Sequence, residues 1–260
     1  MKRVLKIVSL VVVLLLVIAV ALIAPALLGR RSLTEGVEIN GIRVVKDGMV
    51  SVAVIPTGER EVALIDAGND SSGKAILDDL SRRALGPDAV TTIFLTHGHP
   101  DHIAAIAAFP RAHVMALASE VDLVEGRVAA RGPLPRLVPA RPTGVQVARA
   151  LQDGDTVTVG QTQIRVFAVP GHTAGSAAYL AKGVLFLGDA ADAGRDGAVK
   201  GAPWVFSDSQ SEDRASLARL EQRLAQDHAP VKAIVFAHSG ALTEGLTPLT
   251  TFAQAQRTRP

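Results

Sequence analysis

Three of the chain's seven histidines fall within six residues, as His97, His99 and His102, with Asp101 among them. The apolar run Ala89–Leu95 directly precedes this cluster and predicts a buried strand. A loop at a strand end can turn His97 and His99 to one side, and Asp101 and His102 to another. Imidazole and carboxylate are good ligands for zinc, iron or manganese. The segment therefore predicts a metal site, and its arrangement suits two adjacent metals better than one.

Three further polar residues stand at the ends of apolar runs. His172 follows residues 167–171, Asp189 follows 185–188, and His238 follows 234–237. Sites at strand ends are where α/β layers place their ligands. The full set of predicted metal ligands is His97, His99, Asp101, His102, His172, Asp189 and His238.

The rest of the body alternates strand-like and helix-like segments, which predicts an α/β fold in one domain. Apolar runs bounded by turn residues predict strands at 37–45, 49–55, 61–66, 89–95, 113–115, 156–159, 163–169, 176–180, 184–187 and 231–236. Helical periodicity predicts helices over 71–85, 103–109 and 211–226. Residues 120–152 read as a short helix and a long irregular loop, and 190–209 as a second long loop, in which Trp204 is a candidate pocket residue.

These motifs resemble the metallo-β-lactamase superfamily over nearly all of residues 37–240. The resemblance rests on H-x-H-x-D-H at 97–102, G-H-T-x-G-S at 171–176, G-D at 188–189, the late His238, and the turn Asp66-Ala67-Gly68. It implies an αββα four-layer sandwich, preceded here by one N-terminal apolar helix, with the site along one edge of two facing sheets.

The resemblance also implies how the ligands divide. His97, His99 and His172 would hold one metal, Asp101, His102 and His238 the other, and Asp189 would bridge them. Two divalent ions are expected, with zinc first and iron or manganese as alternatives. A metal-bridging hydroxide would attack a carbonyl or phosphoryl centre, and Asp101 would orient it as a catalytic residue. Asp66 is a candidate partner for a metal-binding histidine, although a carboxylate before Gly68 could also cap a turn.

The remaining single residues carry weaker signals. His113, within a short strand, and His228, near a helix end, read as structural or surface histidines, because neither stands in a ligand-like motif. Tyr179 reads as a packing residue. No residue is assigned to substrate binding from the sequence.

Several subfamilies fit the sequence poorly. Asp189 stands where some β-lactamases of the superfamily carry a metal-binding cysteine, and the 22 residues after His238 leave no room for the extra helical domain with which glyoxalase II enzymes bind glutathione. We therefore expect a hydrolase of small-molecule esters, thioesters or lactones. The alternatives are β-lactam or phosphodiester hydrolysis, or a non-catalytic, membrane-attached metal-binding module.

Residues 1–31 form a leader, and residues 32–260 the hydrolase domain. Ile7–Leu28 is almost unbroken apolar sequence, about 33 Å long as a helix against a hydrocarbon core of about 30 Å. Lys2, Arg3 and Lys6 precede it, which predicts a cytoplasmic N-terminus. We expect residues 7–28 to anchor the chain in a membrane with the catalytic domain outside the cytoplasm. The alternative is a signal cleaved at Ala19-Val20-Ala21, which would give a secreted protein.

Charge and cysteine content exclude other classes. Without the five basic leader residues, 22 Lys+Arg face 25 Asp+Glu, so the body is near −3 and offers no electrostatic case for nucleic acid. The chain has no cysteine, which excludes disulfides, thiolate zinc sites and cysteine nucleophiles.

Overall fold

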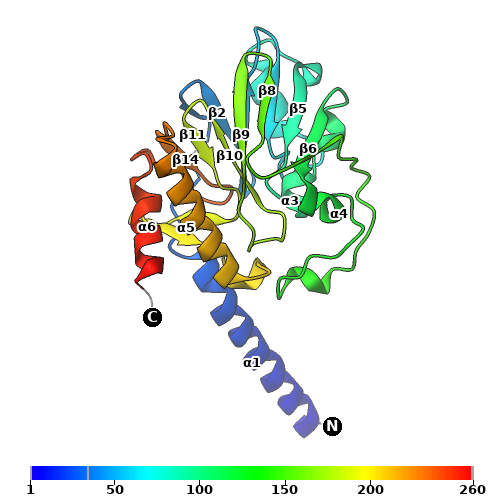
Figure 1. The fold of residues 1–260 in the computed structure, drawn as a ribbon. Coiled ribbons are helices and arrows are strands. Elements are labelled where there is room, and N and C mark those ends of the chain that lie inside the picture. Colours follow the sequence, from blue (N-terminus) through cyan, green and yellow to red (C-terminus); the bar gives the residue numbers. More distant parts are fainter. Residues whose placement is uncertain (1, 34, 259–260) are drawn as a thin grey trace.

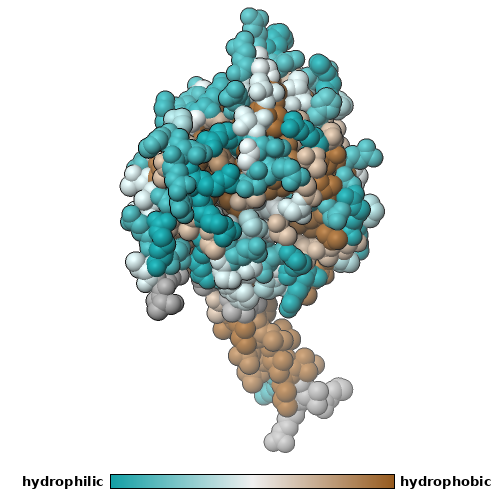
Figure 2. Space-filling model, in the orientation of Figure 1, coloured by the Kyte–Doolittle hydropathy of each residue, from teal (hydrophilic) through white to brown (hydrophobic). Residues whose placement is uncertain are grey.

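The N-terminal helix stands apart from the rest of the molecule. The computed structural model describes residues 2–33 and 35–258 of the chain. Helix α1 (Lys2–Leu27) projects from the body (Figure 1), and its apolar surface is plainly visible (Figure 2). The membrane span predicted for residues 7–28 is not supported: within 2–33 and 35–258, no helix is long and apolar enough to cross a bilayer.

The first half of the body forms a seven-stranded mixed sheet. Its order is β1 (Val37–Ile39), β2 (Ile42–Asp47), β3 (Val50–Pro56), β4 (Val62–Ile65), β5 (Val90–Phe94), β6 (His113–Leu117) and β7 (Arg149–Leu151). The first four strands pair antiparallel, and β4 to β7 pair parallel. The parallel strands bring their carboxyl ends to one edge, from which the histidine cluster follows.

The second half forms a five-stranded sheet of order β14-β11-β10-β9-β8. Its strands are β8 (Thr156–Val159), β9 (Thr162–Ala168), β10 (Ala177–Ala181), β11 (Val184–Phe186) and β14 (Ala233–Val235). The pair β12 (Ala191–Ala193) and β13 (Val199–Gly201) forms a separate two-stranded sheet.

The two large sheets face each other, and helices cover their outer faces, which confirms the αββα sandwich (Figure 1). Successive side chains of β3 point to opposite faces of the first sheet. Ala53 and Ile55 pack between the sheets, whereas Val52 and Val54 pack outward under α2. The covering helices are α2 (Lys74–Ser81), α3 (Pro100–Ile103) and α4 (Val121–Val124) on the first sheet, and α5 (Gln210–Gln226) and α6 (Thr247–Arg257) on the second. Short 3₁₀ helices connect them: η1 (Pro87–Ala89), η2 (Ile106–Ala108), η3 (Ala118–Glu120), η4 (Pro135–Leu137) and η5 (Trp204–Phe206).

The helix predicted at 71–85 is shorter in the structure, as α2 (Lys74–Ser81), and two other predicted elements differ in kind. The strand predicted at 37–45 is the hairpin β1–β2, because Asn40 and Gly41 both take positive φ, 51° and 75°, and turn the chain. The helix predicted at 103–109 is wrong: α3 begins at Pro100 and ends at Ile103, and only the turn η2 follows. A short apolar run does not by itself separate a helix from a turn buried against a sheet.

Three short strands, a 3₁₀ turn and the last helix were not predicted at all. Residues 120–152 contain η4 and the edge strand β7, and residues 190–209 contain the hairpin β12–β13. These strands are three residues long, too short to show a pattern in the sequence. Helix α6 begins at Thr247 with a proline in its first turn, which is a typical helix start. Its few apolar residues form no clear helical pattern, so the helix was not predicted.

The residues that follow α1 are hydrogen-bonded to the body of the molecule. Arg31 N donates to Ala193 O at 2.8 Å, Gly240 N donates to Arg31 O at 3.0 Å, and Arg195 N donates to Gly29 O at 2.9 Å. Arg30 forms an ion pair with Asp192, 2.8 Å from Nε to Oδ2. This pairing holds the end of α1 beside β12, the turn after it and the loop that follows β14.

Tyr179 tests how strongly the two sheets depend on a buried polar contact. Its ring is fully buried between the sheets, and its hydroxyl donates to Leu95 O at 2.7 Å. We expect Tyr179→Phe to lower the free energy of unfolding by about 1–2 kcal/mol, because the buried carbonyl would lose its donor. Urea unfolding measures the difference. Thr158→Ala removes an exposed hydroxyl from β8 and should change stability by less than about 0.5 kcal/mol; equal stability of both variants would contradict the role given to Tyr179.

Candidate metal centre

All seven predicted ligands meet at one edge of the sandwich. His97, His99, Asp101 and His102 follow β5, His172 follows β9, Asp189 follows β11, and His238 follows β14. Donor atoms of His97, His99 and His172 lie within 4.8 Å of one another, as do those of Asp101, His102 and His238, and those of His97, His102 and Asp189. Segments far apart in sequence are thus brought together by the strand ends of both sheets.

The first group is three imidazoles. His172 Nε2 lies 3.2 Å from His97 Nε2 and 3.0 Å from His99 Nδ1. All three rings are buried. Three ring nitrogens that converge this closely form one face of a tetrahedral or larger coordination shell.

The second group contains carboxylates. His238 Nε2 lies 3.4 Å from Asp101 Oδ2 and 3.1 Å from Asp189 Oδ2. His102 Nε2 lies 3.2 Å from Asp189 Oδ1. Asp189 also reaches the first group, since its Oδ2 is 3.6 Å from His172 Nε2. Its carboxylate therefore stands between the two groups.

Two of the rings are oriented by groups that can only accept a hydrogen bond. His238 Nδ1 lies 2.9 Å from Met49 O, and His102 Nδ1 lies 2.8 Å from the carboxylate of Asp66. A carbonyl or a carboxylate accepts, so Nδ1 carries the proton in both rings. The lone pair of a neutral ring then sits on Nε2 and points into the centre.

Two other rings are oriented through hydroxyl groups. Thr96 Oγ1 donates to Asp66 at 2.8 Å and lies 3.1 Å from His97 Nδ1. Ser207 Oγ donates to Pro203 O at 2.8 Å and lies 3.2 Å from His172 Nδ1. Each hydroxyl has already used its proton, so each accepts from the imidazole. His97 and His172 therefore also present Nε2 to the centre.

His99 is the exception, because it presents Nδ1 to the group. Its Nε2 is buried and has no hydrogen-bond partner among the residues described. It is the one ring of the five that no second residue orients through a hydrogen bond in the described part of the chain. Its ring lines the cavity described below.

The pKa shifts of the histidines have opposite directions in the two groups. Burial holds the pKa of His97 well below its usual value and lowers that of His172 to about 3. Burial also disfavours charge on His238, but the carboxylates of Asp189 and Asp101 outweigh it and raise its pKa to about 10. The same balance raises the pKa of His102, through Asp189 and Asp66. Burial opposes the charge of Asp189, yet His238 and His102 hold its pKa well below the usual range.

The residues present fit divalent metal ions. The first group brings neutral lone pairs within 3.2 Å of one another, an arrangement that a cation relieves. In the second, His102 Nε2 and Asp189 Oδ1 are buried without a hydrogen-bond partner among the described residues, although they lie 3.2 Å apart as an ion pair. Imidazole and carboxylate donors suit zinc, and also iron or manganese.

Asp66 joins β4 to the ligand loop after β5. Besides His102, its carboxylate accepts from Thr96 N at 2.7 Å and from Thr96 Oγ1 at 2.8 Å. Its backbone has φ of 63°, in the left-handed region that aspartate tolerates better than most residues. The structure thus places Asp66 as the partner of a histidine, and the turn-capping alternative does not describe its side chain.

Glu120 is a buried site residue that the sequence did not indicate. It lies in η3 after β6, and its Oε1 accepts from Gly98 N at 2.8 Å. Its Oε2 accepts from Gly175 N at 2.9 Å and Thr173 Oγ1 at 3.0 Å. The carboxylate thereby ties the loop of His97 and His99 to the loop of His172. Burial raises its pKa to about 7, although the hydrogen bond from Gly98 opposes this shift.

Gly98 shows how tightly this region is built. A Cβ atom there would lie 2.7 Å from Val124 N, in the backbone of α4. Only glycine therefore lets the ligand loop approach α4 closely enough for its N–H to reach Glu120. No pattern in a single sequence marks a glutamate with this role, because it belongs to no ligand-like motif.

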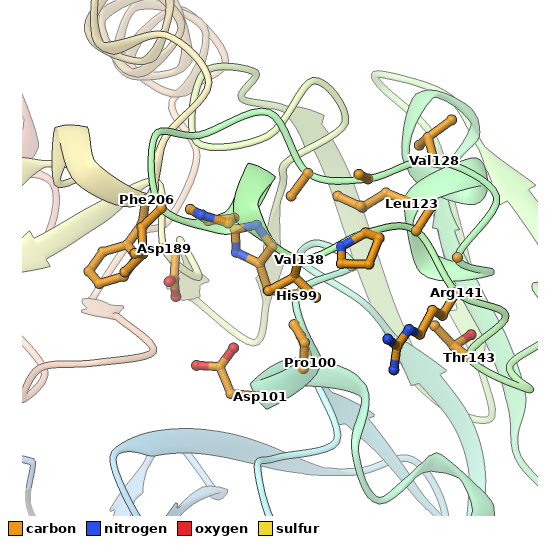
Figure 3. A pocket seen from close by; sticks show the side chains of 18 of the residues that line it. His99, Pro100, Asp101, Leu123, Val128, Val138, Arg141, Thr143, Asp189 and Phe206 are labelled. Atoms are coloured by element: carbon orange, nitrogen blue, oxygen red, sulfur yellow. The ribbon is translucent and has the colours of Figure 1, made fainter.

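A cavity of about 570 Å³ opens beside the ligands (Figure 3). His99, Asp101, Asp189 and His238 contribute to its wall. Trp204, the candidate pocket residue, is not in the lining, but its neighbours Pro203 and Phe206 are. His113 and His228 lie outside both ligand groups and the cavity lining, as predicted.

The fold and the site together define an α/β sandwich with a histidine and aspartate metal centre at the sheet edge. The family profile of the metallo-β-lactamase superfamily matches residues 45–238. The chain therefore belongs to this superfamily, as the sequence motifs predicted.

Curated relatives share part of the chain. A hydroxyacylglutathione hydrolase of Idiomarina loihiensis is 28% identical over 157 residues, which cover 60% of this chain and 52% of the relative. One of Pseudomonas aeruginosa is 32% identical over 168 residues, which cover 62% and 52%. One of Vibrio cholerae is 30% identical over 140 residues, which cover 52% and 44%. The chain thus spans about half the length of these relatives.

Solved structures share the fold over most of the chain. A B3 metallo-β-lactamase with an active-site glutamic acid has a TM-score of 0.63 at 22% identity, covering 92% of each chain. The metallo-β-lactamase MIM-1 of Novosphingobium pentaromativorans has a TM-score of 0.64 at 23% identity, covering 88% of this chain and 89% of that one. At these identities the likeness shows the fold alone.

Glu120→Gln tests whether this carboxylate positions the ligand loops. The amide would turn an NH₂ group toward N–H donors, so the loops of His97 and His172 would lose a shared acceptor. We expect metal affinity to fall about 10- to 100-fold, as for loss of a partner that orients metal ligands. Chelator competition measures affinity directly, without reference to activity.

The matched control is Glu212→Gln, the same chemical change at an exposed position of α5. It should leave metal affinity unchanged. Unchanged affinity in Glu120→Gln as well would mean that the ligand loops keep their geometry without this carboxylate.

Proposed function

We propose that this chain is a dinuclear metal-dependent hydrolase that cleaves an ester, thioester or lactone-type bond in a small molecule. The observation that carries the proposal is the position of Asp189. Its two carboxylate oxygens lie 3.1 to 3.6 Å from the ring nitrogens of His102, His172 and His238. A carboxylate between two sets of ring-nitrogen donors is the arrangement that holds two adjacent cations.

The choice of reaction rests on the curated relatives. Those named above are hydroxyacylglutathione hydrolases, which act on thioesters. The matching segment includes about 60% of this chain for two of them. The ligand set found here, with Asp189 between the groups, agrees with a hydrolytic rather than a purely structural metal site.

Each side chain would have a definite task. His97, His99 and His172 would hold one ion, and Asp101, His102 and His238 the other, with Asp189 shared. Two bound divalent ions, zinc in the first instance, would supply a water of lowered pKa and stabilise the oxyanion that develops on the substrate.

Asp101 would be the catalytic carboxylate. Its side chain is about a quarter exposed and lines the cavity, whereas the neighbouring ring of His102 is buried and lies outside the lining. It can therefore accept a hydrogen bond from the attacking water and set its direction toward the scissile carbonyl. Asp66, Thr96 and Ser207 would keep the rings in the tautomers that present Nε2.

Asp189→Asn tests the shared ligand. The amide keeps the size but loses the charge and one strong oxygen donor. We expect kcat to fall by at least about 10²-fold, and the metal content of purified protein to fall from about two ions per chain toward one. Elemental analysis and a thioester assay on the same preparation measure both.

His228→Ala is the matched control, since His228 lies outside both ligand groups. It should leave kcat and metal content nearly unchanged. Near-normal turnover with two ions in Asp189→Asn would contradict the bridging role given to this carboxylate.

We further propose that the hydrolase domain acts outside the cytoplasm. The support is the order of Lys2, Arg3 and Lys6 before the apolar run of residues 7–28. A reporter enzyme that is active only after export, fused behind Pro260, should be active. The same fusion without residues 1–28 should be inactive, and activity only from a cytoplasm-specific reporter would refute export. The mass of the exported chain would show whether the leader is retained or cleaved.

A further inference from the structure

We propose that the substrate carries an apolar chain next to its scissile bond, and that this chain lies in the cavity under residues 126–143. The inference rests on the proposed hydrolase function and names the class of substrate for the same site. The argument uses the position, lining and anchoring of the cavity.

The cavity begins at the metal ligands. His99, Asp101, Asp189 and His238 form part of its wall, and residues 126–143 form most of the rest; Figure 3 shows His99, Asp101 and Asp189 beside Val138. A carbonyl at the ligands therefore leaves the adjoining part of its molecule inside the cavity. The volume of about 570 Å³ lies within the usual range for small-molecule sites, roughly 300–1,000 Å³.

Apart from the ligands, the lining is mostly apolar. Leu123, Val128, Leu134, Val138 and Phe206 contribute side chains, and the polar exceptions are Arg30, Arg141 and Thr143. Such a wall gains little from the hydroxyl and peptide groups of a polar acyl or glutathione moiety. It favours an alkyl chain, because burial of each methylene contributes about 0.8 kcal/mol.

The exposed apolar residues of the body gather at this cavity. Among described residues after Leu28, the exposed large apolar side chains are Met49, Val128, Leu134, Leu137, Val138 and Trp204. Four of the six line the cavity: Met49, Val128, Leu134 and Val138. Apolar side chains held in water around one opening mark a binding site more often than chance exposure.

The loop is anchored, so the cavity is formed before a ligand arrives. Leu134 N donates to Val205 O at 2.9 Å, and Thr143 Oγ1 donates to Val124 O at 2.7 Å. A Cβ on Gly132 would lie 2.6 Å from Phe206 O, so the loop packs directly on η5. Pro135, Pro139 and Pro142 restrict the backbone further. A preformed apolar wall loses little entropy when a chain binds to it.

The reaction in this cavity is simple hydrolysis. Water adds its oxygen to the acyl carbon, the carbon–sulfur or carbon–oxygen bond breaks, the departing thiolate or alkoxide takes one proton of the water, and the other proton is released to solvent. The products are a carboxylate and that thiol or alcohol, and no further reactant is needed.

A chain-length series on the zinc-loaded protein tests the proposal. S-acyl thioesters of N-acetylcysteamine from acetyl to octanoyl vary the acyl side, and acetyl thioesters of alkanethiols vary the leaving side. The chain has no cysteine, so released thiol can be followed with a thiol reagent. We expect kcat/KM to rise with length in at least one series, by up to about fourfold per methylene.

Val138→Asp places a charge in the lining at an exposed position. It should lower the ratio of octanoyl to acetyl kcat/KM by about tenfold or more. Leu137→Asp is the matched control: this neighbour is 71% exposed and lies outside the lining, so the ratio should not change.

The outcomes separate the two proposals. A rise in either series supports the apolar chain and shows on which side of the bond it lies. Turnover that is independent of length in both series overturns the apolar-chain proposal and leaves the hydrolase intact. If no thioester, ester or lactone is cleaved at any length, the proposed function is wrong, and the apolar-chain proposal that rests on it is wrong as well.

Discussion

The carboxylate of Asp66 is the contact on which the metal centre depends most. It accepts from the backbone and hydroxyl of Thr96 and from His102 Nδ1, and so joins the end of β4 to the loop after β5. Through Thr96 it also orients His97. One buried anion thereby sets the direction of a ring in each ligand group. Its left-handed backbone is tolerated because these hydrogen bonds and the strand ends on either side hold it.

Five imidazoles and two carboxylates gather at one edge, and the favoured protonation state of the imidazoles differs between the two ligand groups. The rings of His97, His99 and His172 are kept neutral by burial and offer lone pairs. His102 and His238 face Asp189 and favour a proton in the absence of a cation. A metal in the second group would have to displace those protons, so its binding would be coupled to proton release. The pH dependence of metal binding would therefore differ between the two groups.

The ligands could be predicted from the sequence because each follows an apolar strand, and parallel strands deliver their carboxyl ends to the same edge. The sandwich followed from the same strands and the resemblance. Glu120 could not be predicted: its partners are backbone N–H groups of Gly98 and Gly175, which carry no side-chain signal. The structural role of Arg30 could not be predicted from the sequence either. In the sequence it belongs to a basic leader, whereas in the structure it pairs with Asp192 and lines the cavity.

The metal centre and the cavity wall are held in place by different parts of the structure. This separation explains how one fold can serve several substrates. The ligands stand on strand ends whose core would be disturbed by any large shift. The cavity wall depends on a proline-rich loop fixed by a few backbone contacts to η5 and α4. Substitutions among Leu134, Val138 and their neighbours can therefore change which substrate fits, without moving a ligand. Under the proposed function, residues 126–143 would determine substrate specificity, because their apolar wall does not suit a polar thioester. The strand-end loops, where Asp189 and Asp101 meet the rings, would determine the chemistry.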